Sequence, residues 1–245
     1  MKRAWLIALW LLLAVAGAWW LLRPTPQQTA LRSRELATRG LAAHLAARFP
    51  GQRALVLSNP YTRRPGLAKG IYAQEQAGLR GLEKGFGRAI SVAAVGFPEL
   101  KPEAQENPLA VEMDPSSPTP LSYLVTDESL DKLVQAHPDC ELVVSLIGLP
   151  AALGRVQAWR TESRVKFALL FPDLRLLGGA AAVRDAVQSG KLAALVLPKP
   201  GAPADQSAAS RDFTQEFERR FLLVTPDTVD ETIATYPQLF GLATR

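Results

Sequence analysis

The chain has 245 residues, of which 48% are hydrophobic and 21% are charged, and its formal net charge is +5. Lys2, Arg3 and Arg23 flank an apolar N-terminal segment, and without them the chain has 25 basic and 23 acidic residues. This near-balance, with no basic run that alternates with aromatic residues, excludes a nucleic-acid-binding surface of the stacking type. Cys140 is the only cysteine, so no internal disulfide can form, and its apolar neighbours predict a buried thiol.

The N-terminal segment from Ala4 to Leu22 contains nineteen uncharged, mostly apolar residues. A helix of this length is about 28 Å long, close to the ~30 Å hydrocarbon core of a bilayer. Trp5, Trp19 and Trp20 stand near its two ends, where indole rings favour the headgroup region. We therefore expect residues 1–23 to form a transmembrane signal anchor.

A cleaved secretory signal is the alternative, because Ala14-Val15-Ala16 and Ala16-Gly17-Ala18 both satisfy the small-x-small rule of signal peptidase. Cleavage at either place would leave Trp19–Leu22 exposed at the new N-terminus or close to it. Basic residues that flank a membrane span tend to stay in the cytoplasm. The arginines after the segment therefore disfavour an extracytoplasmic position of the domain, whereas the very short basic N-terminal tail favours that position. We expect a single-pass protein of the cytoplasmic (inner) membrane whose main domain lies on the extracytoplasmic side.

Residues 24–50 are predicted to form a linker and a juxtamembrane helix. Pro24 and Pro26 end the anchor helix, and apolar residues then recur every four or five positions from about Thr29 to Phe49, with arginines between them. Pro50-Gly51 ends this amphipathic helix. The helix could lie on the membrane surface through its arginines or pack on the following domain, and packing is the commoner fate of such a stripe.

Residues 51–245 alternate short apolar runs with longer helical patterns, and the runs are nearly continuous, as in strands covered on both faces. This βαβα order predicts one α/β domain with a doubly wound, mainly parallel sheet of about six strands. The predicted strands are Ala54–Leu57, Ser91–Phe97, Glu141–Ile147, Val165–Phe171, Leu192–Leu197 and Phe221–Val224. The predicted helices are Leu67–Phe86, Asp127–Ala136, Leu153–Arg160, Gly179–Ser189, Ser210–Arg219 and Asp227–Thr235.

Two connections, Pro98–Tyr123 and Pro198–Ala209, are longer than a compact domain needs. Long loops of this kind tend to be lids, binding loops or disordered excursions. The first is rich in proline and acidic residues, and we expect a short edge strand in it around Leu109–Met113. Its carboxylates lack the spaced Asp/Asn and Gly residues of a calcium loop, which favours solvated charge.

The sequence contains no recognisable catalytic, nucleotide-binding or metal-binding motif. No Gly-x-x-x-x-Gly-Lys-Ser/Thr segment is present, and the glycines from Gly78 to Gly87 end a helix instead of opening one, so they indicate close helix packing. His44 and His137 have no partner at metal-ligand spacing, and no Gly-x-Ser-x-Gly elbow supplies a serine nucleophile. We expect no cofactor and no metal.

The loop after the first predicted strand is the best candidate for a binding site. Ligands of open parallel sheets bind beyond the carboxyl ends of the strands, and this loop places two cations, an aromatic ring and an amide there. A plain turn is the alternative, because Asn59-Pro60 and Pro65-Gly66 are turn formers. The expected residues for a small or anionic ligand, with the Pro98–Tyr123 loop close by, are Ser58, Asn59, Tyr61, Arg63, Arg64 and Lys199.

The same part of the chain resembles the opening of type I periplasmic substrate-binding proteins. Ala54–Tyr61 is similar to the strand and Asn-Pro-aromatic turn of their first lobe, and Gly70–Gly87 and Ser91–Val95 are similar to the glycine-bearing helix and the strand that follow. Leu130–Ile147 is similar to the next helix and strand. The resemblance covers about the first half of the domain and implies an exported α/β fold with a ligand site at Asn59–Tyr61. That family closes two lobes on a solute, whereas this chain has room for one.

The sequence therefore predicts a membrane-anchored domain that acts by binding, either a small ligand or a protein partner in an envelope complex, and not nucleic acid. An enzyme of unrecognised type at the same carboxyl edge is the alternative, and its candidate reacting groups are Ser58, Ser145, Asp173 and Lys199. A purely structural accessory subunit is the third reading. A pocket with perturbed titrating groups would favour the enzyme, whereas a broad exposed apolar patch would favour a partner surface.

We predict that the segment from Ala4 to Leu22 remains in the mature protein, because cleavage would leave an aromatic and aliphatic end in water. Mass spectrometry of protein purified from membranes should find the intact segment. Recovery of a species that begins at Gly17 or Trp19 would contradict the anchor.

Overall fold

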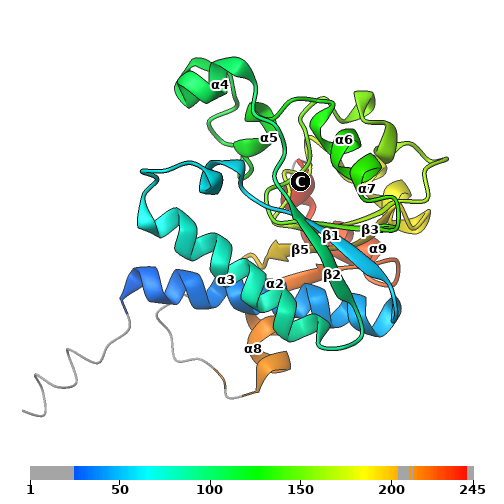
Figure 1. The fold of residues 1–245 in the computed structure, drawn as a ribbon. Coiled ribbons are helices and arrows are strands. Elements are labelled where there is room, and N and C mark those ends of the chain that lie inside the picture. Colours follow the sequence, from blue (N-terminus) through cyan, green and yellow to red (C-terminus); the bar gives the residue numbers. More distant parts are fainter. Residues whose placement is uncertain (1–24, 204–209, 211, 242–245) are drawn as a thin grey trace, which may run out of the picture.

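Six strands form one sheet in the order β2-β1-β3-β4-β5-β6 (Figure 1). Neighbouring strands from β2 to β5 are parallel, and β6 is antiparallel to β5. The computed structural model describes residues 25–203, 210 and 212–241. All six strands were predicted, and their bounds are β1 Arg53–Leu57, β2 Ser91–Gly96, β3 Leu142–Ser145, β4 Lys166–Leu170, β5 Leu192–Pro198 and β6 Phe221–Val224.

The helices cover both faces of the sheet, so the predicted doubly wound α/β architecture is confirmed (Figure 1). Successive residues of a strand point to opposite faces, and Val56 packs in one hydrophobic cluster while Leu55 and Leu57 pack in the other. The helices on the Val56 side are α2 Pro26–Arg48, α3 Lys69–Phe86 and α8 Phe213–Arg220. The helices on the Leu55 side are α6 Ser129–Ala136, α7 Gly179–Gln188 and α9 Val229–Thr235.

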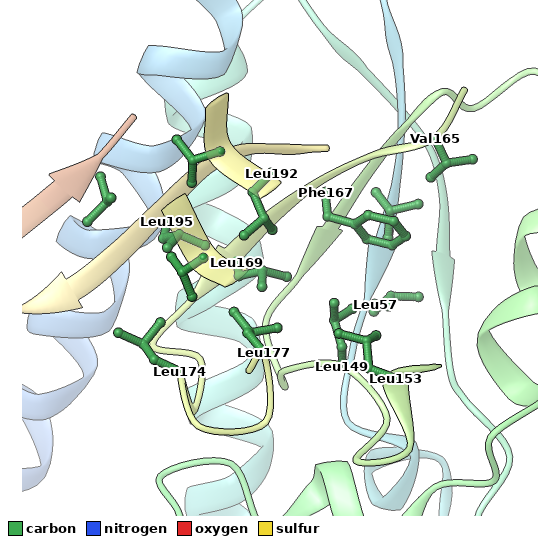
Figure 2. Close-up of a cluster of buried hydrophobic side chains, with 14 of the residues drawn as sticks. Leu57, Leu149, Leu153, Val165, Phe167, Leu169, Leu174, Leu177, Leu192 and Leu195 are labelled. Atoms are coloured by element: carbon green, nitrogen blue, oxygen red, sulfur yellow. The ribbon is translucent and has the colours of Figure 1, made fainter. Parts of the chain in front are cut away.

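The larger cluster joins strand residues to the loops at the carboxyl edge of the sheet. Figure 2 shows Leu57, Phe167 and Leu169 of the strands near Leu149 and Leu177 of the loops that follow β3 and β4. All five side chains are buried. These contacts fix the loops in place, and the loops in turn form the surface on which a ligand of this fold would sit.

The juxtamembrane helix predicted for Thr29–Phe49 is α2, and it packs on the domain. Thr25 and Gln28 begin it with a capping box, in which each side chain bonds the other residue's backbone N–H. Leu41 and Leu45 are fully buried in the cluster that covers β1 and β3. The first helix is therefore part of the domain core.

Helices α2 and α3 lie side by side and run in the same direction (Figure 1). A Cβ atom built at Gly81 would lie 1.9 Å from Thr38 Oγ1, and one built at Gly85 would lie 2.5 Å from the Ala42 Cβ. The glycines of α3 thus allow a close backbone approach, as the sequence indicated.

Two predicted elements are wrong. Residues 153–160 form two short 3-10 helices, η3 Leu153–Arg155 and η4 Gln157–Trp159, because the Asp131 carboxylate accepts hydrogen bonds from the N–H groups of residues 157 and 158. The edge strand expected around Leu109–Met113 is absent from the described residues. The 3-10 helix η2 Pro108–Ala110 begins there instead, with Asn107 as its cap.

The described residues contain no helix that is both long enough and apolar enough to cross a membrane. The predicted anchor, residues 1–23, lies outside them, as do residues 204–209 of the second long loop.

We predict that Gly81→Ala lowers the free energy of unfolding by about 1–3 kcal/mol, because the new Cβ would also lie 2.4 Å from the Glu35 carbonyl oxygen, a backbone atom that cannot rotate away. Gly70→Ala in the same helix is the matched control, since its Cβ would meet nothing closer than 3.5 Å. It should be neutral or stabilising by up to about 1 kcal/mol. Urea denaturation measures both, and equal stability of the two variants would contradict the close packing of α2 on α3.

Candidate functional site

The carboxyl ends of β1 and β3 meet where the strand order reverses, the usual ligand position in this topology. Here a buried polar network fills that position. Ser58 Oγ donates to Glu75 Oε2 at 2.9 Å, and Arg34 Nη2 donates to Glu75 Oε1 at 3.2 Å and to the Leu146 carbonyl at 3.1 Å. The network ties α2 and α3 to the ends of β1 and β3, so Ser58 serves the fold in this arrangement.

The other residues of the predicted loop are also bonded within the chain. Asn59 Oδ1 accepts from the Tyr61 N–H at 2.9 Å and caps the 3-10 helix η1 Pro60–Arg63. The Tyr61 hydroxyl donates to the Ala104 carbonyl at 2.7 Å, and Arg64 Nη1 donates to the Gln105 carbonyl at 2.7 Å. The loop therefore holds the long connection that follows β2, which lies close by as expected.

That connection, residues 98–125, is called the excursion here. It contains α4 Pro102–Glu106, η2 and α5 Leu121–Leu124, and a small apolar cluster of its own that includes Leu100, Ala104 and Leu124. An isolated bridge between Leu100 and Val125 closes its base. The excursion is thus an ordered cap on the carboxyl edge (Figure 1).

Lys199 and Arg63 have separate surroundings. The Arg63 guanidinium is exposed and lies 5.3 Å from the centre of the Phe97 ring. Lys199 follows β5, which β3 and β4 separate from β1 by about 14 Å at ~4.8 Å per strand. The Lys199 amine donates to the Glu218 carbonyl at 2.9 Å. The structure therefore brings Ser58–Arg64 together with the excursion but not with Lys199, and ligand binding by these residues stays a prediction.

A pocket of about 430 Å³ opens beside the excursion, at the carboxyl ends of β4 and β5. The excursion contributes Ser116 and Pro118 to its wall. The loop after β4 contributes Phe171, Asp173 and Arg175, and the end of β5 and the C-terminal turn η5 Pro237–Phe240 complete it. The pocket therefore draws its lining from four segments that are far apart in the sequence.

Phe171, in the wall of this pocket, has an unusual backbone conformation. Its φ angle is +48°, and among the described residues it is the only non-glycine with a positive φ. A bulky side chain in that region costs free energy, and such residues cluster at functional sites. Phe171 follows the end of β4 directly, and Pro172 and Asp173 after it line the same pocket.

Arg175 joins the pocket wall to the excursion. Its Nη2 and Nε donate to Asp173 at 2.7 and 3.0 Å, while its Nη1 donates to Asp114 Oδ2 at 2.7 Å and to Ser116 Oγ at 3.0 Å. Burial alone would raise the pKa of Asp173, but hydrogen bonds from Arg175 and Ser117 outweigh it and hold that pKa below its ordinary value. The carboxylate of Asp173 is therefore ionised at neutral pH and fastens the excursion through Arg175.

The residues considered for catalysis are not arranged for it. Ser145 Oγ donates to the Gly148 carbonyl, which is not a base, and Ser58 Oγ donates to a Glu75 carboxylate that is paired with Arg34. Both serines are buried, so neither hydroxyl is open to a substrate. Both histidines lie toward the amino edge of the sheet, His44 near the end of α2 and His137 just after α6. No group of three metal-ligating side chains occurs among the described residues.

The most perturbed amine is also far from the pocket. Burial first, and then the nearby Lys166, lowers the pKa of Lys191 to about 8, against an opposing effect of Glu162. Lys191 stands just before β5, at the amino edge, and donates to the Ser163 carbonyl at 3.1 Å. Its shift has a structural cause and marks no site at the carboxyl edge.

From the sequence, Asp173 is predicted only as a candidate reacting group, and Phe171, Arg175 and Asp114 are not predicted to belong to a site. The Asp-x-Arg spacing directly after a buried strand was the available signal, because a guanidinium two residues from a carboxylate can fold back onto it. Nothing in the sequence pairs Arg175 with Asp114, which stands 61 residues earlier.

No family model and no curated protein matches the chain. Its structure is similar to a carbohydrate transporter from Acidothermus cellulolyticus in complex with myo-inositol, at 12% identity and a TM-score of 0.47 over 84% of this chain and 62% of that one. A sugar ABC transport substrate-binding protein from Bordetella parapertussis also matches, at 12% identity and a TM-score of 0.44 over 81% of this chain and 57% of that one.

A periplasmic solute-binding protein from Actinobacillus succinogenes with bound D-allose matches at 12% identity and a TM-score of 0.43, over 81% of this chain and 62% of that one. The chain thus spans about three fifths of these proteins. The likeness agrees with the weak resemblance to periplasmic substrate-binding proteins found in the sequence. At this level of identity it concerns the fold.

We predict that Arg175→Gln destabilises the protein at neutral pH and that the difference from the parent protein shrinks as the pH falls below about 4. The pKa of Asp173 is lowered in the folded state, so its contribution is present above the unfolded value and is lost as the pH falls through the folded value. Thermal unfolding at a series of pH values measures this.

Arg184→Gln is the matched control, because Arg184 has the same 46% side-chain exposure as Arg175 but pairs with one carboxylate, Asp230, that is itself 65% exposed. It should change the unfolding temperature less than Arg175→Gln does at neutral pH. An Arg175→Gln variant that is no less stable than Arg184→Gln, or whose deficit persists unchanged in acid, would contradict the role assigned to Asp173 and Arg175.

Proposed function

We propose that this protein is a non-catalytic binding domain that takes a small polar ligand in the pocket between the excursion and the carboxyl ends of β4 and β5. In this proposal residues 1–23 anchor it in the cytoplasmic membrane with the domain on the extracytoplasmic side. The pocket carries the proposal. Its volume of about 430 Å³ falls in the range of roughly 300–1,000 Å³ that is usual for small-molecule sites.

The composition of the pocket supports a neutral or mixed polar ligand. Its walls are largely apolar, with Phe171, Leu174 and Leu197 among them, and its few polar groups include Arg175 and the exposed Gln238. Apolar walls with a small number of hydrogen-bonding groups are typical of sites that hold a ligand in one orientation. Polyols and sugars fit this chemistry, because they offer hydroxyl groups at their edges and C–H groups on their faces.

The position of α2 determines where an anchor would hold the domain. The helix begins at Pro26, only three residues after the apolar segment that ends at Leu22, and it is packed into the core. A membrane-embedded N-terminal segment would therefore hold the whole domain close to the bilayer. One lobe cannot enclose a solute by itself, so the ligand would stay partly open to water or to a second subunit.

The test measures binding of a panel of polyols, sugars and small zwitterions to the full-length protein in detergent by calorimetry. Gln238→Trp should abolish the binding of any ligand found, because the indole would fill the pocket. Arg63→Ala is the control at the other end of the edge and should bind normally. Loss of binding in Arg63→Ala with retention in Gln238→Trp would place the ligand at the Ser58–Arg64 loop, and the absence of any ligand in the panel would contradict a polar small-molecule site.

A further inference from the structure

The modest net charge of the chain conceals a strong division along its length. Residues 25–97 contain eleven Lys and Arg but three Asp and Glu, whereas the rest of the described chain contains twelve basic and nineteen acidic residues. A sign asymmetry of this size between two parts of one domain is typical of proteins that meet a charged surface.

The fold gathers much of the positive charge on one face. Helices α2 and α3 lie side by side on the sheet (Figure 1), and their outward side chains form what we call the α2–α3 face. The exposed basic residues of the two helices, with the one just after α3, are Arg32, Arg39, Arg48, Lys69, Arg80, Lys84 and Arg88. Of the acidic residues in these two helices, only Glu83 is exposed. Glu35 is half-buried and pairs with Arg80 and Lys84.

The opposite face of the sheet carries the opposite sign. Helices α6, α7 and α9 together contain four acidic residues and two basic ones, Lys132 and Arg184. Both of these bases are paired with carboxylates, Glu99 and Asp230. The domain is therefore electrically polarised through its thickness, with its positive side on the helix that follows the predicted anchor.

We propose that the α2–α3 face lies against the anionic phospholipid headgroups of the membrane that holds the anchor; this rests on the anchor of the proposed function. Residues 23–25 extend to at most about 11 Å, while α2 is about 34 Å long. The tether thus keeps the face at high effective concentration next to the bilayer. Each exposed Lys or Arg near an anionic surface adds to the attraction, and the acidic face would turn away from it.

This orientation has a consequence for the pocket. The α2–α3 face covers one side of the sheet, whereas the pocket opens at the carboxyl edge. With the face on the membrane, the pocket would open sideways, level with the bilayer surface, and the excursion would remain free to contact other molecules at that level.

The test uses the full-length chain reconstituted in phosphatidylcholine vesicles with and without phosphatidylglycerol, and with a quencher attached to lipid headgroups. A fluorophore is placed at Gln76→Cys on α3 or at Ala181→Cys on α7, both exposed positions, in a Cys140→Ala background. Quenching at residue 76 should exceed quenching at residue 181 when phosphatidylglycerol is present. Quenching at residue 76 should fall when phosphatidylglycerol is left out and when the salt concentration is high, because ions screen the attraction between basic side chains and anionic headgroups.

Two double variants test the residues. Arg80→Gln/Lys84→Gln should lower the equilibrium constant for the orientation with the α2–α3 face on the lipid about tenfold. The matched control Lys132→Gln/Arg184→Gln removes the same charge from two paired surface residues of the other face and should leave quenching unchanged. Equal quenching at both labels, no dependence on phosphatidylglycerol, or equal effects of the two double variants would overturn the orientation and leave the anchor intact. A chain that does not sediment with either kind of vesicle would overturn both.

Discussion

The close approach of α2 to α3 is the contact on which the rest of the structure depends. Gly78, Gly81 and Gly85 remove the side chains that would otherwise separate the two helices, and α2 can then seat Leu41 and Leu45 on the sheet. Larger residues at these three positions would have to displace α2 outward. Its buried leucines would then lose contact with the strands, and the sheet would lose much of one covering layer.

The same approach brings the Arg34–Glu75–Ser58 network together. Arg34 reaches Glu75 from a neighbouring helix, and Glu75 reaches Ser58 at the end of β1. A buried carboxylate is costly unless it is paired and hydrogen-bonded, so each contact depends on the others. The network occupies the place where a ligand binds in many sheets of this order. The pocket of about 430 Å³ at the same edge lies instead beside β4 and β5.

The strands and most helices could be predicted from the sequence because their signals are local. A strand buried on both faces has to be apolar throughout, which is why β1, β3 and β5 are recognisable as short runs such as Leu192–Leu197. The misplaced helix at Leu153–Arg160 shows the limit of this reasoning. Its apolar spacing suits a helix, but Asp131 of α6 captures two of its N–H groups, and that contact exists only in the folded chain.

The sequence could predict that a site would lie at the carboxyl edge of the sheet, but not where along that edge. Strand order was needed to show that Lys199 lies apart from Tyr61 and that Arg175 meets Asp114. The residues of the Ser58–Arg64 loop have the right chemistry for a ligand, yet Asn59, Tyr61 and Arg64 form bonds with the chain itself. Likewise, the overall charge balance gave no sign of the α2–α3 face, because acidic residues elsewhere offset it and only the fold separates the two signs.

Hydrogen exchange of the full-length protein, measured by mass spectrometry, tests the central role of α2 most directly. If α2 is part of the core, the backbone amides from Ala37 to Leu45 exchange only when the sheet opens, at the same rate as those of β1 and β3. Exchange of these amides well before those of the strands, as expected of a helix that merely links an anchor to an independent domain, would contradict this account.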